Sequence, residues 1–172
     1  MPPRPTLKLA QTDREIAAYY QLRQEIFCQE QQLFEDDRDA TDATAYPIVA
    51  VSHQTNTDQT NTERIVGIVR IYERKPRLWY GGRLGVHPDF RQGGRVGRGL
   101  IQKAVTTANQ WGCDRFLATV QAQNVRFFRR LHWCSLAEID ICQRPHHLME
   151  ADLACYPPNG EPRPLRSGQF VA

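Results

Sequence analysis

A glycine-rich basic loop, set between a short apolar segment and an amphipathic one, is the part of this sequence best suited to chemistry. Apolar residues 84–86 precede Pro88, and from Leu100 onward apolar residues recur at helical spacing. A strand, a loop and a helix in this order form an anion site, because the free amides and the dipole at a helix N-terminus favour negative charge. Glycine lets a phosphate approach the backbone closely, and arginine adds forked hydrogen bonds. The loop and first helical positions contain Arg91, Gly93, Gly94, Arg95, Gly97, Arg98 and Gly99.

Length and composition limit the classes of protein to which the chain can belong. Its 172 residues are 41% apolar and 24% charged, which is typical of a soluble globular protein with a real core. We expect one domain over residues 1–155, followed by a proline-rich tail over 156–172. No apolar run is long enough to span a membrane, and the N-terminus lacks the apolar centre of a signal peptide. A cytoplasmic protein without membrane contact is therefore expected.

Cysteine usage and net charge argue against metal, disulfide and nucleic-acid functions. The five cysteines are widely spaced without a CxxC pair, which predicts reduced thiols and no zinc site. His146 and His147 lie near Cys142, but nothing else converges there, so a turn is expected rather than a metal site. A net charge of +3 does not by itself indicate nucleic-acid binding.

The N-terminal part predicts a strand, a capped helix and an acidic segment. Residues 6–10 alternate as a strand does, and Thr12 followed by Glu15 forms a capping-box pattern that opens a helix to Phe27. The segment 28–45 predicts a shorter second helix and a loop. It is either a solvated surface or a wall that attracts a cationic substrate. Its carboxylates are Glu30, Glu35, Asp36, Asp37, Asp39 and Asp42.

The remaining elements complete a mixed α/β pattern. Gly85 lies inside a predicted strand, where glycine often marks a bulge or the close approach of another backbone. The element order predicts an α/β (α+β) fold with a mixed, mainly antiparallel sheet of about six to seven strands and about four helices. The expected elements are strands at 46–52, 65–72, 78–87 and 116–120, helices from Gly97 to near Gly112 and at 125–131 with Asn124 as cap, and a final hairpin of 135–141 and 147–154 with Pro145 at its turn.

Two motifs resemble the acyl-CoA motifs of the GNAT superfamily of N-acetyltransferases. VHPDFRQGGRVGRGLI resembles its arginine and glycine loop, and VQAQNVRFFRRLHW resembles its second, asparagine-containing helix. LRQEIFCQEQ is similar to the first helix of many members, and the element order matches the GNAT fold over about residues 5–155. The segment HHLMEADLA and the paired phenylalanines resemble a bacterial nitrogen-starvation N-acetyltransferase family.

The resemblance implies an acetyl-CoA site and, with it, N-acetyltransferase activity. The strand 84–86 would bind pantetheine as an added strand does, and amides from 93 to 98 would hold the pyrophosphate. Asn124 would lie near the pantetheine arm, and Arg126, Arg129 or Arg130 would reach the adenosine phosphates. The implied cofactor residues are Leu84, Gly85, Val86, Gln92, Gly93, Gly94, Arg95, Val96, Gly97, Arg98, Asn124, Phe127, Phe128 and Arg129.

The chain departs from the family pattern at two places. In the loop, Arg95 or Val96 stands where the pattern has a glycine, depending on the direction of counting, which implies a shift of one residue. Phe128 occupies the position of a tyrosine that protonates the leaving thiolate in many members. Catalysis could survive this change, because a thiol with a pKa near ~8.5 leaves tolerably well as thiolate at neutral pH.

Proton transfer from the amine needs a base, since an alkylammonium is only about one part in 10³ neutral at pH 7. Glu73 and Glu30 are candidates, and His87 is a weaker one because it lies where the cofactor is expected. His132 and Cys134 are candidates for the acid that replaces the tyrosine. Each of them could equally be an ordinary surface side chain.

Three functions remain open at this point. An acetyltransferase acting on a small-molecule primary amine is favoured, and a non-catalytic acyl-CoA sensor is the alternative that Phe128 suggests. Nucleic-acid binding is the weakest, because the arginines belong to one loop and one helix. The acidic segment favours a cationic acceptor, whereas Arg23, Arg70 or Arg83 could meet a carboxylate. The predicted C-terminal hairpin could pair across a homodimer.

Overall fold

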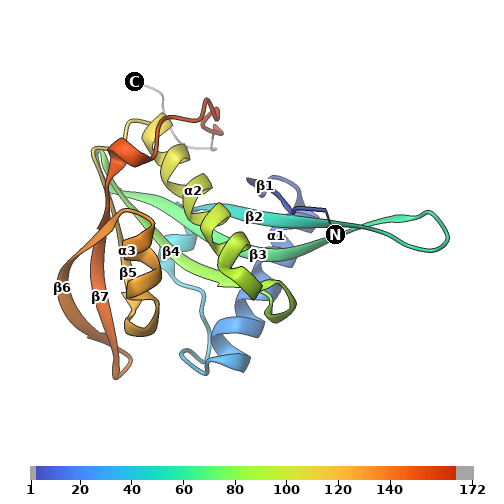
Figure 1. Cartoon of the computed structure of the whole chain (residues 1–172), viewed down its shortest axis with the longest axis horizontal. Helices are drawn as coiled ribbons and strands as arrows, with labels where there is room; N and C mark the ends of the chain where they lie inside the picture. Colours follow the sequence, from blue (N-terminus) through green and yellow to red (C-terminus); the bar gives the residue numbers. More distant parts are fainter. Residues whose placement is uncertain (1–2, 166–172) are drawn as a thin grey trace.

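The computed structural model describes residues 3–165 and contains one seven-stranded sheet (Figure 1). The strand order is β1-β2-β3-β4-β5-β7-β6, and only the β4–β5 pair is parallel. The mixed, mainly antiparallel sheet predicted from the sequence is confirmed. Its strands are β1 (Thr6–Leu9), β2 (Tyr46–Thr55), β3 (Asn61–Lys75), β4 (Leu78–Val86), β5 (Arg115–Gln121), β6 (Trp133–Ile141) and β7 (Arg144–Ala151).

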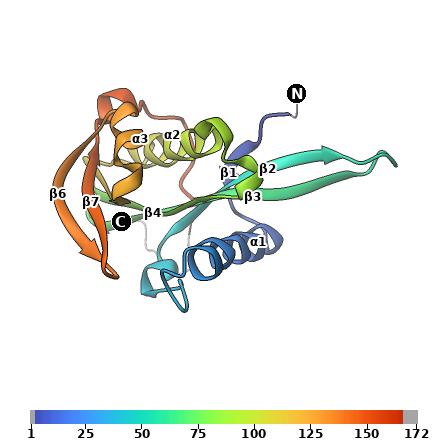
Figure 2. The same cartoon turned by 60° about the horizontal axis from the view of Figure 1, so that its bottom comes forward.

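Helices cover both faces of this sheet. The helices α2 (Arg95–Gln110) and α3 (Val125–Arg130) lie on one face, and α1 (Asp13–Arg23) lies on the other (Figure 2). The α2 helix connects the parallel strands β4 and β5, as a parallel pair requires. No helix in residues 3–165 is both long and apolar enough to cross a membrane.

The first helix begins where its sequence predicts. The Thr12 hydroxyl accepts a hydrogen bond from the Glu15 amide, and the Glu15 carboxylate accepts one from the Thr12 amide. Tyr19 and Leu22 of this helix, and Ile26 just after its end, are buried against the sheet. The chain then continues as a π-helix, η1 (Gln24–Glu30), whose wider turn follows α1 without a break.

The acidic segment differs from the prediction. It contains a single 3-10 turn, η2 (Ala40–Ala43), and no second α-helix, so three α-helices occur among the described residues rather than four. Asp39 precedes the turn and Asp42 accepts a hydrogen bond from the Asp39 amide. Side-chain bonds to the backbone of this kind favour turns over helices.

The larger core lies between α2 and the sheet. Leu100, Ala104 and Val105 on α2 are fully or almost fully buried, which agrees with the apolar spacing in the sequence. Gly99 lets β1 pack closely, because a Cβ there would lie 2.8 Å from a methyl group of Leu7. The same cluster continues to Trp133 and Tyr156 at the end of the fold.

The C-terminal hairpin has its turn at Cys142 and Gln143, not at Pro145. Both turn residues have positive φ, of 50° and 61°, which is the conformation of a tight two-residue hairpin. Pro145 lies inside β7, opposite Asp140 of β6. Proline occurs in strands where its missing amide is not needed, and the prediction had treated it only as a turn signal.

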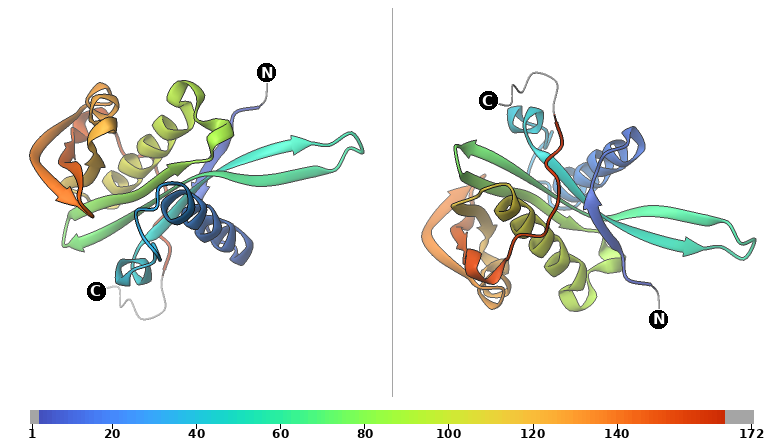
Figure 3. Two further views of the ribbon diagram at one scale, coloured as in Figure 1. Left: turned by 90° about the horizontal axis from the view of Figure 1, so that it is seen from below. Right: turned by 90° about the horizontal axis from the view of Figure 1, so that it is seen from above.

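Residues 156–165 run along α2 and close the end of the sheet (Figure 3, right). The side chain of Arg163 lies over the rings of Tyr46, Trp79 and Trp111, at 5.0–5.7 Å. Trp111 Nε1 donates to the Glu161 carbonyl at 2.8 Å. The last seven residues of the tail expected over 156–172 lie outside the described part.

Candidate active site

The parallel strands β4 and β5 separate part of the way along their length. They are paired from Leu78 with Arg115 to Gly81 with Ala118, and no pair follows. The rest of β4 and of β5 therefore leaves two strand edges facing a gap. A cavity of about 280 Å³ opens at this place.

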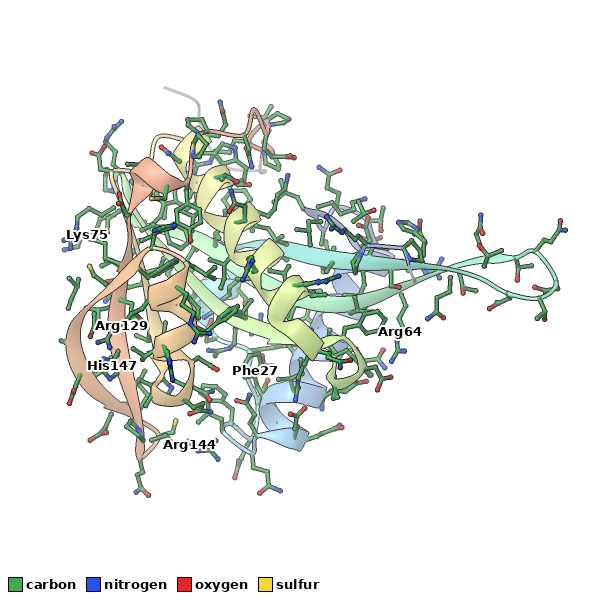
Figure 4. The ribbon with its side chains drawn as sticks, viewed as in Figure 1. Phe27, Arg64, Lys75, Arg129, Arg144 and His147 are labelled. Atoms are coloured by element: carbon green, nitrogen blue, oxygen red, sulfur yellow. The ribbon has the colours of Figure 1, made fainter. Side chains whose placement is uncertain are left out.

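The cavity reaches both layers of the molecule. Ile101, Ala104 and Phe128 line it from the α2–α3 side of the sheet. Phe27 and Phe34 line it from η1 and the segment that follows. Figure 4 labels Phe27 in this region, near the end of the first helix. Side chains from both faces of the sheet therefore meet at the gap between the two strands.

The β4 edge of the gap contains a bulge. Between the pairs Ile68–Gly85 and Arg70–Gly82, β4 has one residue more than β3. Arg83 lies in this bulge with a φ of 54°, a conformation that is uncommon for a residue other than glycine. The bulge that Gly85 predicted is present. The close neighbour of Gly85 is a side chain, since a Cβ there would lie 2.8 Å from Ile26.

The N-terminus of α2 follows directly beyond β4 and provides free backbone donors. Gly93 and Gly94 have φ of 74° and 66°, and the helix begins at Arg95. No side chain caps the helix at Gly94, so the amides of its first turn have no partner within the helix. The glycine loop is thus arranged as an anion site although its spacing differs from the family pattern.

The second motif lies beside this helix terminus. The ring of Phe127 packs against Gly94, where a Cβ would lie 3.0 Å from Cε2. Asn124 stands at the start of α3 but makes no capping hydrogen bond, and it lines the cavity instead. Phe128 is buried in the cavity wall against Trp133. Arg129 is exposed on α3 (Figure 4).

None of the five residues predicted to move protons lines the cavity; they are Glu30, Glu73, His87, His132 and Cys134. Glu30 forms a forked ion pair with Arg91 at 2.6 and 2.7 Å, and this bond holds the pKa of Glu30 below its ordinary value. Glu73 accepts hydrogen bonds from the Arg77 amide and the Arg163 guanidinium. His132 lies at the turn between α3 and β6, on a different pocket.

His146 was not predicted as a site residue, yet it is buried and lines the cavity. Its Nδ1 lies 2.9 Å from the Arg144 carbonyl oxygen, which can only accept. In the neutral imidazole the proton is therefore on Nδ1, and Nε2 keeps a lone pair. Its neighbour across the strands is Gln121, which bonds Gln31 after η1, so His146 lies on the α1 side. The sequence contained only the histidine pair, without a sign of this placement.

The α1 side also contains a stack of two tyrosines. The rings of Tyr72 and Tyr80 are 5.8 Å apart and both line the cavity. Burial raises the pKa of Tyr72, so its hydroxyl stays protonated at neutral pH and can donate a hydrogen bond. No group of three or more metal-ligating side chains occurs among residues 3–165.

Three arginines bind the acidic segment to the body of the protein. Arg23 is fully buried and contacts Asp37 at 2.6 Å and Asp42 at 2.7 Å. Arg70 contacts Asp39 at 2.7 Å and Asp42 at 2.8 Å. The carboxylates of Asp37, Asp39 and Asp42 are therefore paired with arginines, whereas Glu35 and Asp36 of the same segment are exposed to solvent.

Comparison with known proteins identifies a family over most of the chain. The model described as the acetyltransferase (GNAT) family matches residues 11–133. Escherichia coli ElaA is similar in structure, with a TM-score of 0.70 and 21% sequence identity, over 86% of this chain and 99% of that chain. An acyl-CoA N-acyltransferase from Pseudomonas aeruginosa has a TM-score of 0.69 and 20% identity, over 86% and 99% of the two chains.

Proposed function

Because this chain belongs to the acetyltransferase (GNAT) family, we propose that it moves an acetyl group from acetyl-CoA to the primary amine of a small molecule. The observation that supports this function best is the cavity between β4 and β5, whose wall includes Ile101 of α2, the helix that begins with free amides at Arg95. The first turn of α2 would bind the nucleotide, and the cavity would hold the second reactant. Holding two reactants in contact supplies much of the rate of a transfer reaction.

Acetyl-CoA would enter from the α2–α3 side. Its pyrophosphate would accept hydrogen bonds from the amides of Gly93 and of the first turn of α2, whereas the Gly94 amide already donates to the Arg91 carbonyl. The pantetheine arm would lie along the unpaired part of β4, at Leu84–Val86, with Asn124 opposite. Arg126, Arg129 and Arg130 are exposed on α3 and would meet the adenosine phosphates.

The amine would approach from the α1 side and attack the thioester carbon directly. We propose that His146 accepts the ammonium proton through Nε2, because His146 lines the cavity and its Nδ1 contact with the Arg144 carbonyl leaves the lone pair on Nε2. Glu30, Glu73 and His132 remain weaker proposals, since they lie outside the cavity. Attack forms the amide bond, breaks the carbon–sulfur bond and leaves CoA as thiolate.

The thiolate would leave without the tyrosine that many family members use. Phe128 has no proton to give, but an ordinary thiol pKa near ~8.5 makes unassisted departure feasible near neutral pH. Tyr72 and Tyr80 contribute phenol hydroxyl groups to the cavity wall. Transfer without a general acid would be slower by roughly 10²- to 10⁴-fold than with one.

The test is a titration with acetyl-CoA followed by an assay of thiol release over a panel of amines. We expect saturable stabilisation of the purified protein against heat, and release of CoA with at least one amine class. No thermal shift at millimolar acetyl-CoA would contradict the whole proposal.

A non-catalytic acyl-CoA sensor is the second candidate, which the buried Phe128 favours. It predicts the same stabilisation by acetyl-CoA but no thiol release with any amine. Turnover with one acceptor at a useful rate would exclude it.

A further inference from the structure

Positive charge is in excess on the α1 side of the cavity. Three arginines, Arg70, Arg74 and Arg83, line the cavity, whereas no aspartate or glutamate of the described residues does. Arg23 lies behind them, so four guanidinium groups face three carboxylates, those of Asp37, Asp39 and Asp42. The difference, four minus three, leaves one positive charge uncompensated in this wall.

Arg83 is the member of the cluster with the weakest ionic contacts. It lies 3.5 Å from Asp37 Oδ2 and 3.4 Å from Asp39 Oδ2, longer than the 2.6–2.8 Å contacts of Arg23 and Arg70. Its closer hydrogen bond, at 2.9 Å, goes to the neutral carbonyl of Asp37. Burial, and then the positive charges of Arg70 and Arg23, lower the pKa of Arg83. An anion beside Arg83 would relieve this repulsion.

Arg70 and Arg74 provide further donors at the same wall. Arg70 Nε is buried without a hydrogen-bond partner in residues 3–165, beside Gly82. Arg74 is exposed and forms no ion pair with any described residue. Its guanidinium lies over the ring of Tyr80 at 5.3 Å, which keeps it at the cavity.

We propose that the acceptor is a primary amine that also carries a carboxylate, as an amino acid does, and that Arg83 and Arg74 bind this carboxylate. The inference rests on the proposed acetyl transfer and names its substrate class. A guanidinium fork matches the two oxygens of a carboxylate. A polyamine would instead bring a second cation to a wall that already repels one. The acidic segment alone suggested the opposite, a cationic acceptor, but its Asp37, Asp39 and Asp42 carboxylates are engaged by arginines.

The experiment compares matched amines that differ only at the carboxylate. Each set contains an L-amino acid, its amide and the amine without the carboxyl group, for example phenylalanine, phenylalaninamide and phenethylamine, and lysine, lysinamide and cadaverine. Phosphoethanolamine tests whether phosphate serves as the anion. Thiol release gives kcat/KM, and heat denaturation of the CoA-loaded protein reports binding of the same compounds without turnover.

We expect the amino acid to exceed its amide by roughly 10- to 100-fold in kcat/KM, as charge-assisted hydrogen bonds allow. Amine basicity alone would favour the amide, because its amine is less basic and a larger fraction of it is in the neutral, nucleophilic form. Arg74→Gln should remove most of this preference, because it should raise KM for the amino acid and leave KM for the amide at its wild-type value.

Lys75→Gln is the matched control for Arg74→Gln. It removes the same charge from the next residue of β3, and Lys75 does not line the cavity. Figure 4 shows Lys75 at the end of β3 that is remote from the β2–β3 hairpin tip. This control should keep the full preference for the carboxylate.

The outcomes separate the two proposals. Turnover in which amides or simple amines equal the amino acids would overturn the carboxylate site and leave acetyl transfer standing. Selective, Arg74-dependent binding of amino acids without turnover would keep the site and reject the transferase. Better use of phosphoethanolamine than of every amino acid would assign the arginines to phosphate and reject a carboxylate. If neither binding nor turnover is selective for carboxylates, the inference is rejected.

Discussion

Glu30 and His146 show how the surroundings of a side chain decide its chemistry. Glu30 has the residue type of a general base, but the fork of Arg91 stabilises its charged form and lowers its affinity for a proton. His146 is one of two adjacent histidines, and only its position on β7 turns it toward the cavity. His147, next to it, is bound to the Ser135 hydroxyl at 2.8 Å.

This contrast gives a prediction at the level of the residue. His146→Gln should lower kcat by roughly 10²- to 10⁴-fold, the usual contribution of a positioned base, with little change in KM for acetyl-CoA. The remaining rate should rise with pH, because more of the amine is then neutral without help. Steady-state kinetics across pH would measure both effects.

His147→Gln is the control, since it changes the same residue type one position away. It should retain the wild-type rate. Equal loss in both variants would point to a structural role of the hairpin, and no loss in His146→Gln would remove His146 from the mechanism.

At the scale of elements, the anion site depends on how β4 ends and α2 begins. The bulge at Arg83 changes the course of β4, and the pair Gly93–Gly94 turns the chain into the helix with both residues at positive φ. Phe127 of α3 packs against Gly94, so the two sequence motifs meet at one glycine. Space for a cofactor and packing of the fold are thus decided by the same atoms.

Gly94→Ala tests this junction, and Gly160→Ala is its matched control. Both glycines have positive φ, 66° and 76°, so an alanine at either position would be strained by a similar amount, about 1–2 kcal/mol. Only at Gly94 would the new Cβ meet another group, Phe127 at 3.0 Å, whereas nothing lies within 4 Å at Gly160.

We expect Gly94→Ala to lower the free energy of unfolding by about 1 kcal/mol more than Gly160→Ala does, which is the lower end of the cost of overpacking. It should also weaken acetyl-CoA binding by at least about tenfold. Gly160→Ala should bind acetyl-CoA as the wild type does. Urea unfolding and calorimetric titration would measure the two quantities. Equal behaviour of the variants would show that the junction with α3 is not important for the site.

At the scale of the whole molecule, the acidic segment is a cross-link. Its aspartates join α1, β3 and β4 through Arg23, Arg70 and Arg83, across a large separation in sequence. Burial raises the pKa of Asp42, but hydrogen bonds from Arg23, the Asp39 amide and Arg70 outweigh it and lower that pKa to about 2. The charged form of Asp42 is therefore favoured in the folded protein.

This cross-link predicts a defined loss of stability in acid. Because the folded pKa of Asp42 is lowered from 3.8 to about 2, its contribution is complete above pH 4 and is lost as the pH falls toward 2. Asp42→Asn should destabilise the protein at pH 7 by about 3–5 kcal/mol, since Arg23 keeps a buried charge with one partner fewer.

The difference between Asp42→Asn and wild type should shrink below pH 4, where the wild type loses the same charge. Unfolding by urea at a series of pH values would show this. Asp140→Asn, at an exposed position of β6 away from the arginine cluster, is the control and should follow the wild-type curve. A constant difference down to pH 2 would contradict the assignment.

Local signals in the sequence determined the elements and the cofactor motif. The Thr12 capping box, the apolar spacing on α2 and the glycine pair before it act through neighbours in the chain, so sequence alone could identify them. The family was identified for the same reason, because its acyl-CoA motifs are contiguous.

Tertiary structure alone decided the partners of the charged residues. Arg91 meets Glu30 across 61 positions, Arg83 meets Asp39 across 44, and His146 turns toward a gap made by strands far from it in sequence. Ion pairing and burial depend on distances in space, which periodicity does not encode. The glycine loop was therefore predictable as a candidate anion site, whereas the positions of His146 and of the arginines at the cavity required the fold.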